Sequence, residues 1–213
     1  MTRKVFWTEP YLSKLSTTVS GVAGAQVRLS ETIIFAFSGG QESDTGTIDG
    51  HAVLASQKQG LEIVYTLAQD HGLMVGQSVM VEIDGDRRLK LMRLHFAAEL
   101  VLELVYKRLG SVQKIGAHIA QDKARIDFAW PDSLASLLPD IETAANAIVA
   151  ADMAISTGFD DEANERLHWE ISGFSRIPCG GTHVKRTGEI GPIRLKRLNK
   201  GRGNERVEIY LAG

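Results

Sequence analysis

The sequence is poor in cysteine and aromatic residues, and it has no long hydrophobic run. Its 213 residues include a single cysteine, which excludes an internal disulfide and suits a reducing compartment. No stretch approaches the roughly 18 apolar residues of a membrane-spanning helix, and the first residues lack the apolar centre of a secretion signal. We therefore expect a cytoplasmic protein with no membrane partner. Apolar residues make up 44% of the chain, enough for one core or two small ones.

A strong net charge is also lacking, but the charges are unevenly distributed. The formal net charge is -2. Between Asp127 and Glu170 ten acidic residues stand against one basic residue, whereas between Arg176 and Arg206 nine basic residues stand against two acidic ones. Such a basic segment suits a polyanionic partner such as a nucleic acid. A solvated strand face of lysines and arginines is the alternative interpretation.

Residues 16–83 have the pattern of short strands rather than helices. β-Branched runs such as AQVRL, TIIFAF, LEIVYTL and SVMVEI alternate with turn segments such as SGGQESD and KQG. Runs of this length and spacing predict a small antiparallel β-barrel or sandwich. The pattern changes near Asp86, so we expect two domains, 1–86 with the strands and 87–213 with the rest.

The second domain begins with a long helical segment, DRRLKLMRLHFAAELVLELVYKRLG. Lys107 and Arg108 suit its last turn, and Gly110 suits its C-terminal cap. Apolar residues occupy nearly every face, which predicts a largely buried helix. A hairpin over 114–130, a helix entered at Pro139, and the strand runs LHWEIS, PIRLKRL and ERVEIYLA follow. We therefore expect an α+β domain with its helices packed on an antiparallel sheet.

The long helix carries a polar pair in otherwise apolar surroundings. His95 and Glu99 are four residues apart, which places both side chains on one helix face. A carboxylate in such surroundings needs a cation, a hydrogen-bond partner or a raised pKa, and two ligands one turn apart are a common half of a zinc site. Cys179 and His183, in the sharp turn PCGGTH, could supply the other half. Core packing is the alternative, because a lone cysteine is most often a small buried residue.

Several motifs give the sequence a family resemblance. PCGGTHV (Pro178–Val184) is followed by TGEIG (Thr187–Gly191), and KGRGNERVEIYL suits a closing strand. Upstream, IFAFSGGQESDTGTI contains a glycine-rich loop, and RRLKLMRLH enters the long helix. With these segments the chain resembles the alanyl-tRNA editing proteins (AlaX), relatives of the editing domain of alanyl-tRNA synthetase, over nearly its whole length. Its size and its N-terminal strands resemble the medium-sized subclass.

The resemblance implies a small N-terminal antiparallel β-barrel followed by an α+β editing domain that binds zinc. His95, Cys179 and His183 match three ligand positions of the family. Glu99 stands where the family pattern H-x-x-x-H has its second histidine, and a carboxylate oxygen can also bind zinc. Phe96 stands where the family usually has a threonine that helps to select a small hydroxylated amino acid, so amino-acid specificity stays open. The implied metal ligands are His95, Glu99, Cys179 and His183.

The glycine-rich loop matches the family only in part. Ser38 and Glu42 differ from the family pattern, whereas Gly39, Gly40 and Gln41 match it. Gln41 is the loop residue that the resemblance implies in substrate contact, and an exposed polar turn is the alternative. The implied substrate-binding residues are Gly39, Gly40, Gln41, Phe96, Gly180 and Thr182, and the implied catalytic residues are Gln41, Cys179 and His183.

The resemblance implies a hydrolase that cleaves the ester between a wrong amino acid and the 3′ end of a tRNA, with serine on alanine tRNA as the leading substrate. A metal with an open position would support ester cleavage, whereas a metal closed by four protein ligands would mainly shape the pocket. Cys179 as a covalent nucleophile is the competing mechanism, and the general base is unassigned. Two other functions stay open: a non-catalytic tRNA-binding relative, and a hydrolase of a different aminoacyl-tRNA or small ester.

The implied partner is the acceptor end of tRNA, and we expect the protein to be a monomer. Basic residues at the entrance of the long helix and in the C-terminal segment suit contacts with phosphates. The residues expected to bind nucleic acid are Arg87, Arg88, Lys196, Arg197, Lys200 and Arg202.

Overall fold

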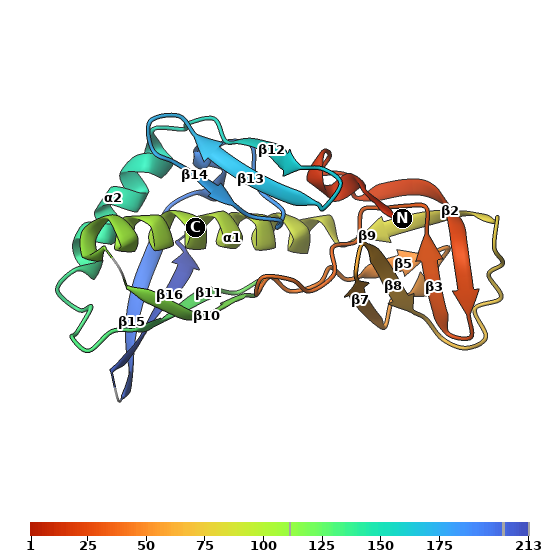
Figure 1. Cartoon of the computed structure of the whole chain (residues 1–213), viewed down its shortest axis with the longest axis horizontal. Helices are drawn as coiled ribbons and strands as arrows, with labels where there is room; N and C mark the ends of the chain where they lie inside the picture. The colour runs from red at the N-terminus through yellow and green to blue at the C-terminus, as the bar shows by residue number, and fades with distance from the viewer. Residues whose placement is uncertain (111, 202, 213) are drawn as a thin grey trace. The chain divides into compact units, whose positions relative to one another are not determined.

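The computed structural model describes residues 1–110, 112–201 and 203–212 (Figure 1). The chain is α+β, as expected, and its sheets are mostly antiparallel. It divides into two compact units: the first comprises residues 1–38 and 42–89, and the second comprises 39–41 and 90–213. The glycine-rich loop, expected in the first domain, thus gives Gly39–Gln41 to the second unit.

The first unit is built on one curled, open sheet rather than a closed barrel. Among the described residues no pairing joins its two outermost strands, β6 and β7. A parallel pair, β1 (Arg3–Lys4) with β4 (Glu31–Thr32), and the short 3-10 helix η1 (Val5–Trp7) lie outside this sheet. The strand order in the sheet is β6 (His51–Ala52), β5 (Gly46–Ile48), β9 (Ser78–Ile83), β2 (Lys14–Ala23), β3 (Gln26–Leu29), β8 (Glu62–Thr66) and β7 (Ala55–Gln59).

Two segments of this unit differ from the sequence pattern. The run TIIFAF was expected as a strand, but residues 33–36 are buried without being part of one. Their backbone is satisfied by a side chain instead, because the Phe35 amide donates a hydrogen bond of 2.6 Å to the Asp44 carboxylate. Conversely, β2 was missed because serine, threonine and glycine fill much of its length.

An ion pair is buried in the first unit. The Arg88 side chain is 2% exposed, and its guanidinium contacts both carboxylate oxygens of Asp44. It also donates to the backbone carbonyls of Ile33 (2.6 Å) and Pro10 (3.1 Å). Because this guanidinium is buried and four of its five N–H groups bond groups inside the protein, Arg88 offers no surface for the expected contact with nucleic acid. Its role is to hold the non-strand segment 33–36 in place.

In the second unit, α1 (Gly85–Leu109), which starts in the first unit, lies between two sheets (Figure 1). One sheet has the order β10 (Gln113–Ile119), β11 (Ala124–Ala129), β16 (Asn204–Leu211) and β15 (Ile193–Gly201). The other has the order β12 (Ser156–Asp161), β13 (Arg166–Ile171) and β14 (Ser175–Pro178). The helix α2 (Leu138–Ala150) packs against β15 and the 3-10 helix η2 (Thr187–Ile190). The expected hairpin over 114–130 and the helix after Pro139 are confirmed.

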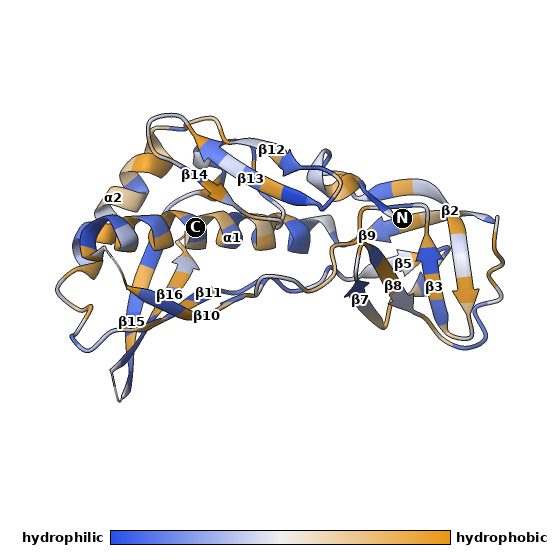
Figure 2. Cartoon of the chain, in the orientation of Figure 1, coloured by the Kyte–Doolittle hydropathy of each residue, from blue (hydrophilic) through white to orange (hydrophobic). Residues whose placement is uncertain are grey.

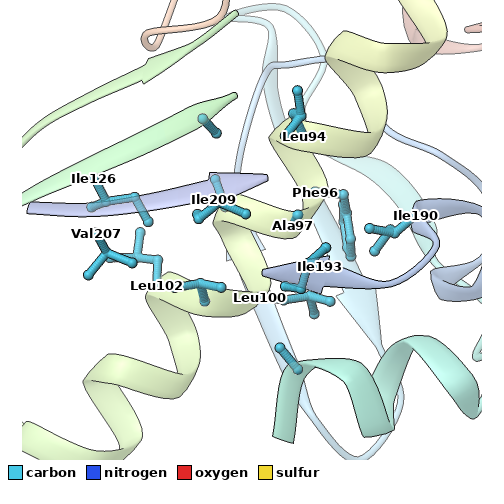
Figure 3. Close-up of a cluster of buried hydrophobic side chains, with 14 of the residues drawn as sticks. Leu94, Phe96, Ala97, Leu100, Leu102, Ile126, Ile190, Ile193, Val207 and Ile209 are labelled. Carbon is cyan, nitrogen blue, oxygen red and sulfur yellow. The ribbon is translucent and has the colours of Figure 1, made fainter. Parts of the chain in front are cut away.

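The core of the second unit surrounds α1. Hydrophobic residues recur along α1, α2 and the strands of this unit (Figure 2). Val207 and Ile209 of β16 and Ile126 of β11 join Leu100 and Leu102 of α1 in one cluster (Figure 3). Burial on several sides explains why the sequence of α1 is apolar on nearly every face. None of the helices in the described part of the chain is long and apolar enough to cross a membrane.

Candidate metal centre

Three candidate ligands from distant segments meet beside α1. His95 comes from the helix, and Cys179 and His183 come from the turn that follows β14. One potential ligand atom of each residue lies within 4.8 Å of the other two. The Cys179 Sγ and His95 Nε2 atoms are 3.5 Å apart. The Cys179 amide donates a 2.9 Å hydrogen bond to the Leu167 carbonyl, which fixes the turn against β13.

Glu99 lies next to this group with its two oxygens in different surroundings. Its Oε1 atom is 3.4 Å from His95 Nε2 and 3.6 Å from Cys179 Sγ. Its Oε2 atom accepts a hydrogen bond of 3.2 Å from the indole N–H of Trp169. The sequence placed Glu99 in the site through its spacing from His95, but nothing in the spacing pointed to Trp169.

The residues present fit a metal ion. The His183 Nε2 atom is buried and has no hydrogen-bond partner in the part of the chain that the structure describes. A buried polar atom of this kind is costly to leave unsatisfied, and a metal ion would satisfy an imidazole nitrogen. Two imidazoles and a thiol, with a carboxylate beside them, form a donor set typical of zinc.

The side chains of this group also shift each other's pKa values. Burial raises the pKa of the Cys179 thiol, but the neighbouring His95 and His183 outweigh it and lower that pKa to about 6. For His95 the directions are reversed. Burial lowers its pKa, but the neighbouring Cys179 and Glu99 outweigh burial and raise the pKa to about 10. Thiolate is the form of cysteine that binds metals. The cluster therefore favours the ligand form of Cys179 in the protein itself.

The turn between the two ligands needs glycine at one position. A Cβ atom at Gly181 would lie 1.9 Å from His95 Cε1 and 2.5 Å from His95 Nδ1. A Cβ atom at the neighbouring Gly180 would meet nothing within 4 Å. The backbone at Gly181 therefore packs directly against the His95 ring.

Gln41 and Thr182 are hydrogen-bonded to each other rather than directed at open space. The Gln41 amide donates to Thr182 Oγ1 (2.8 Å), and the Thr182 backbone N–H donates to Gln41 Oε1 (3.2 Å). Both side chains are buried. This pair joins the glycine-rich loop to the cysteine turn, and it uses both the amide nitrogen and the amide oxygen of Gln41 inside the protein.

A pocket opens beside His95 and Glu99, between α1 and the sheet. Of the expected substrate-binding residues, Gly39 lines this pocket. Gly40 instead pairs with β10, where its carbonyl accepts a hydrogen bond from the Ile119 amide (2.8 Å). Its φ is 91°, and a Cβ atom added to it would lie only 2.7 Å from the Ala117 carbonyl oxygen. The pocket is lined by Gly39, His95, Ala98, Glu99, Leu102, Lys114, Ala117, Ile119 and Ile126.

Phe96 lies in the core, whereas the resemblance implied a role in substrate binding. It has no exposed surface and is absent from the pocket lining. Its ring packs edge-on against Trp169 (centroids 5.0 Å apart) and His183 (5.5 Å). Phe96 therefore supports the candidate ligand His183 from the core. The sequence could not reveal this burial. When a helix is apolar on nearly every face, the place of Phe96 directly after His95 does not show whether its side chain points to the pocket or to the core.

The other residues expected to bind nucleic acid differ in their surroundings. Lys196 and Lys200 are exposed on β15. Arg197 donates a hydrogen bond of 2.7 Å to Glu205, and Arg87 in the first unit donates one of 2.7 Å to Glu42. Arg202 lies outside the described residues. Gly180 is exposed next to Cys179.

The comparisons with known proteins agree with this geometry. A family described as "Threonyl and Alanyl tRNA synthetase second additional domain" matches residues 170–208. A protein of Pyrococcus horikoshii named alanyl-tRNA editing protein AlaX-M is 34% identical to the chain, covering 99% of the chain and 98% of that protein. The chain belongs to the alanyl-tRNA editing protein AlaX-M family. The AlaX-M of Methanosarcina mazei is 30% identical over 99% of the chain and 97% of its own length.

The chain is also similar to part of a larger protein. The alanine–tRNA ligase of Korarchaeum cryptofilum is 30% identical over 93% of the chain but only 25% of its own length. The matched family domain includes Cys179 and His183 but not His95 or Glu99. The resemblance to AlaX is thus confirmed, whereas the pairing of the two halves of the site comes from the geometry of this member.

Proposed function

We propose that the chain is an aminoacyl-tRNA deacylase that hydrolyses the ester bond between a wrong amino acid and tRNA(Ala). The observation that carries the proposal is the convergence of His95, Cys179 and His183 in a member of the alanyl-tRNA editing family. The names of the relatives, alanyl-tRNA editing protein and alanine–tRNA ligase, support this substrate class. Charged tRNA is used in the cytoplasm, so we propose that location, and a monomer remains the expected state.

We propose zinc as the metal, held by His95, Cys179 and His183 with Glu99 as the fourth ligand. Imidazole and thiolate ligands suit zinc, whereas calcium and magnesium prefer oxygen ligands. When bound, zinc would supply a Lewis acid for the ester carbonyl, which with four protein ligands would require expansion to a fifth position. The thiol of Cys179 then serves as a ligand and not as a nucleophile, because a thiolate bound to a metal is a weaker nucleophile.

The proposed pocket suits a small amino acid. The methyl groups of Ala98 and Ala117 line it together with Ile119 and Leu102. These hydrophobic lining residues would exclude bulk water from the ester. We propose serine as the amino acid removed, with glycine as the second candidate.

Deacylation of charged tRNA tests this function. The native protein is expected to hydrolyse Ser-tRNA(Ala) in preference to Ala-tRNA(Ala), and Cys179→Ala is expected to lower kcat/KM by about 100-fold or more, because it removes a ligand of the charge-stabilising metal. The measurement is release of labelled amino acid, with the zinc content of both proteins determined in parallel. Failure on every charged tRNA despite a full metal site would favour a hydrolase of another small ester. Binding of tRNA without hydrolysis would favour a non-catalytic relative.

Lys114 is a positively charged residue that lines the pocket and was not among the residues expected to bind nucleic acid. It is exposed, and it lies on β10 opposite Phe128, whose side chain is buried on the α1 face of the sheet. Lysine binds phosphate as a point charge. We propose that Lys114 contacts a phosphate of the acceptor end when the ester enters the pocket. Exposed Lys196 and Lys200 remain proposed phosphate contacts for the rest of the tRNA.

Truncation of Lys114 should affect only substrates that carry phosphates. Lys114→Ala is expected to lower kcat/KM for a charged minihelix by about tenfold, the effect of losing one charge-assisted hydrogen bond. Hydrolysis of the corresponding aminoacyl-adenosine, which has no phosphate, should not change. Steady-state kinetics with the two substrates measure the difference, and Lys114→Arg, which keeps the charge, is the matched control. An equal loss with both substrates would assign Lys114 to the shape of the pocket.

A further inference from the structure

The carboxylate of Glu99 is held from the core by an indole. Trp169 on β13 is fully buried, and its ring packs edge-on against Phe96 with the centroids 5.0 Å apart. The indole nitrogen can only donate a hydrogen bond, and Glu99 Oε2 is its acceptor at 3.2 Å. Because the ring is enclosed on all sides, it cannot turn to another acceptor. The position of Oε2 is therefore fixed by the core.

The other oxygen of Glu99 faces the candidate ligands. Oε1 lies 3.4 Å from His95 Nε2 and 3.6 Å from Cys179 Sγ. A carboxylate can bind a metal through one oxygen or through both, whereas an imidazole always offers one nitrogen. The two oxygens of Glu99 thus have different neighbours even without a metal: Oε2 contacts the indole, and Oε1 contacts the candidate ligands.

We infer that Trp169 is a positioning residue that makes Glu99 a one-oxygen ligand of the metal. The hydrogen bond from the indole occupies Oε2 and leaves Oε1 as the single donor, so that Glu99 takes the place of a histidine without adding a fifth donor atom. Groups that hydrogen-bond to metal ligands set their orientation and commonly change metal affinity by about 10- to 100-fold. This inference rests on the metal site proposed above, but not on the identity of the substrate.

A purely structural role is the competing explanation, because Trp169 is also a large core residue. The two roles differ in their dependence on Glu99. A positioning role requires the carboxylate, whereas a packing role does not. Trp169→Phe removes the N–H and keeps most of the ring, and Glu99→His replaces the carboxylate by an imidazole that has no second oxygen to be held.

The test is a double-mutant cycle read by metal binding to the full chain. Trp169→Phe is expected to weaken zinc affinity about tenfold, measured by competition with a chromophoric chelator. With cobalt in place of zinc, the intense visible bands of four-coordinate cobalt should weaken as the freed carboxylate binds through both oxygens. In the Glu99→His background, Trp169→Phe should change neither quantity.

Several outcomes would overturn the inference. An equal loss of zinc affinity in both backgrounds would make Trp169 a packing residue, and no loss in either would remove it from the site. Should Trp169→Phe not fold, the indole N–H resonance of ¹⁵N-tryptophan-labelled protein provides a second measurement. It should shift when Glu99→His is introduced, and an unchanged resonance would contradict the hydrogen bond. Because metal binding is the readout, a protein that binds zinc in this way but deacylates no tRNA would refute the proposed function alone.

Discussion

Replacing Gly181 with alanine is expected to weaken zinc binding by about 100-fold or more, because the new methyl group would displace the imidazole of the proposed metal ligand His95. The added Cβ would lie 1.9 Å from His95 Cε1, well inside van der Waals contact, and 2.9 Å from Gln41 Oε1. The His95 ring cannot move away easily, since the neighbouring residues of α1 are buried on several sides. Zinc affinity measured by chelator competition is the direct readout.

Gly180→Ala is the matched control for this change. It introduces the same methyl group one residue earlier, where nothing lies within 4 Å. Neither glycine has a positive φ, so the two substitutions differ in what the methyl group meets and not in backbone strain. Similar zinc affinities for both variants would show that His95 does not bind the metal in the orientation seen here.

The substitution Asp44→Ala is expected to destabilise the protein by about 3–5 kcal/mol, because it leaves the guanidinium of Arg88 buried without its counter-charge. The Asp44 carboxylate accepts from Arg88 Nε at 2.8 Å and from the Phe35 amide at 2.6 Å, so its loss also leaves a backbone donor unsatisfied. Urea denaturation followed by circular dichroism measures the change in the free energy of unfolding.

Asp70→Ala provides the comparison, since Asp70 is exposed in a turn of the same unit. Its effect should lie within about 0.5 kcal/mol. In the double variant Asp44→Ala/Arg88→Ala the loss of stability should be smaller than the sum of the two single losses, because neither charge then remains buried alone. Strict additivity would mean that the two side chains do not stabilise each other.

Much of this architecture was predictable because it depends on local pattern. The helix α1 follows from a continuous apolar segment that ends in Lys107, Arg108 and a glycine with φ of 69° at position 110. The resemblance to AlaX implied His95, Cys179 and His183 as ligand positions, and the structure brings these three residues together. The helix needs no knowledge of which segments meet, whereas this group does.

The features that were not predicted depend on long-range contacts. Gln41 was expected at the substrate, but its amide is bonded to Thr182, 141 residues away along the chain. Arg88 belongs to a basic stretch at the start of α1, and only the fold reveals that Asp44 buries it. A helix that is apolar on all sides likewise gives no sign that Phe96 faces Trp169. In each case the local sequence would look the same whether the side chain were exposed or buried.

The three residues Gly39–Gln41 give the chain an unusual path. The backbone enters the second unit at Gly39, leaves it after Gln41 and returns at Lys90. Within this three-residue segment, Gln41 forms a parallel β-bridge with Ile119 and a hydrogen bond to Thr182 of the cysteine turn. A C-terminal fragment cut near residue 86 would therefore keep all four candidate ligands but lack Gly39–Gln41, the segment that is hydrogen-bonded to the cysteine turn. Separating the halves of this protein by proteolysis or gene dissection would leave the metal-binding half incomplete, even though every atom that would touch the ion is still present.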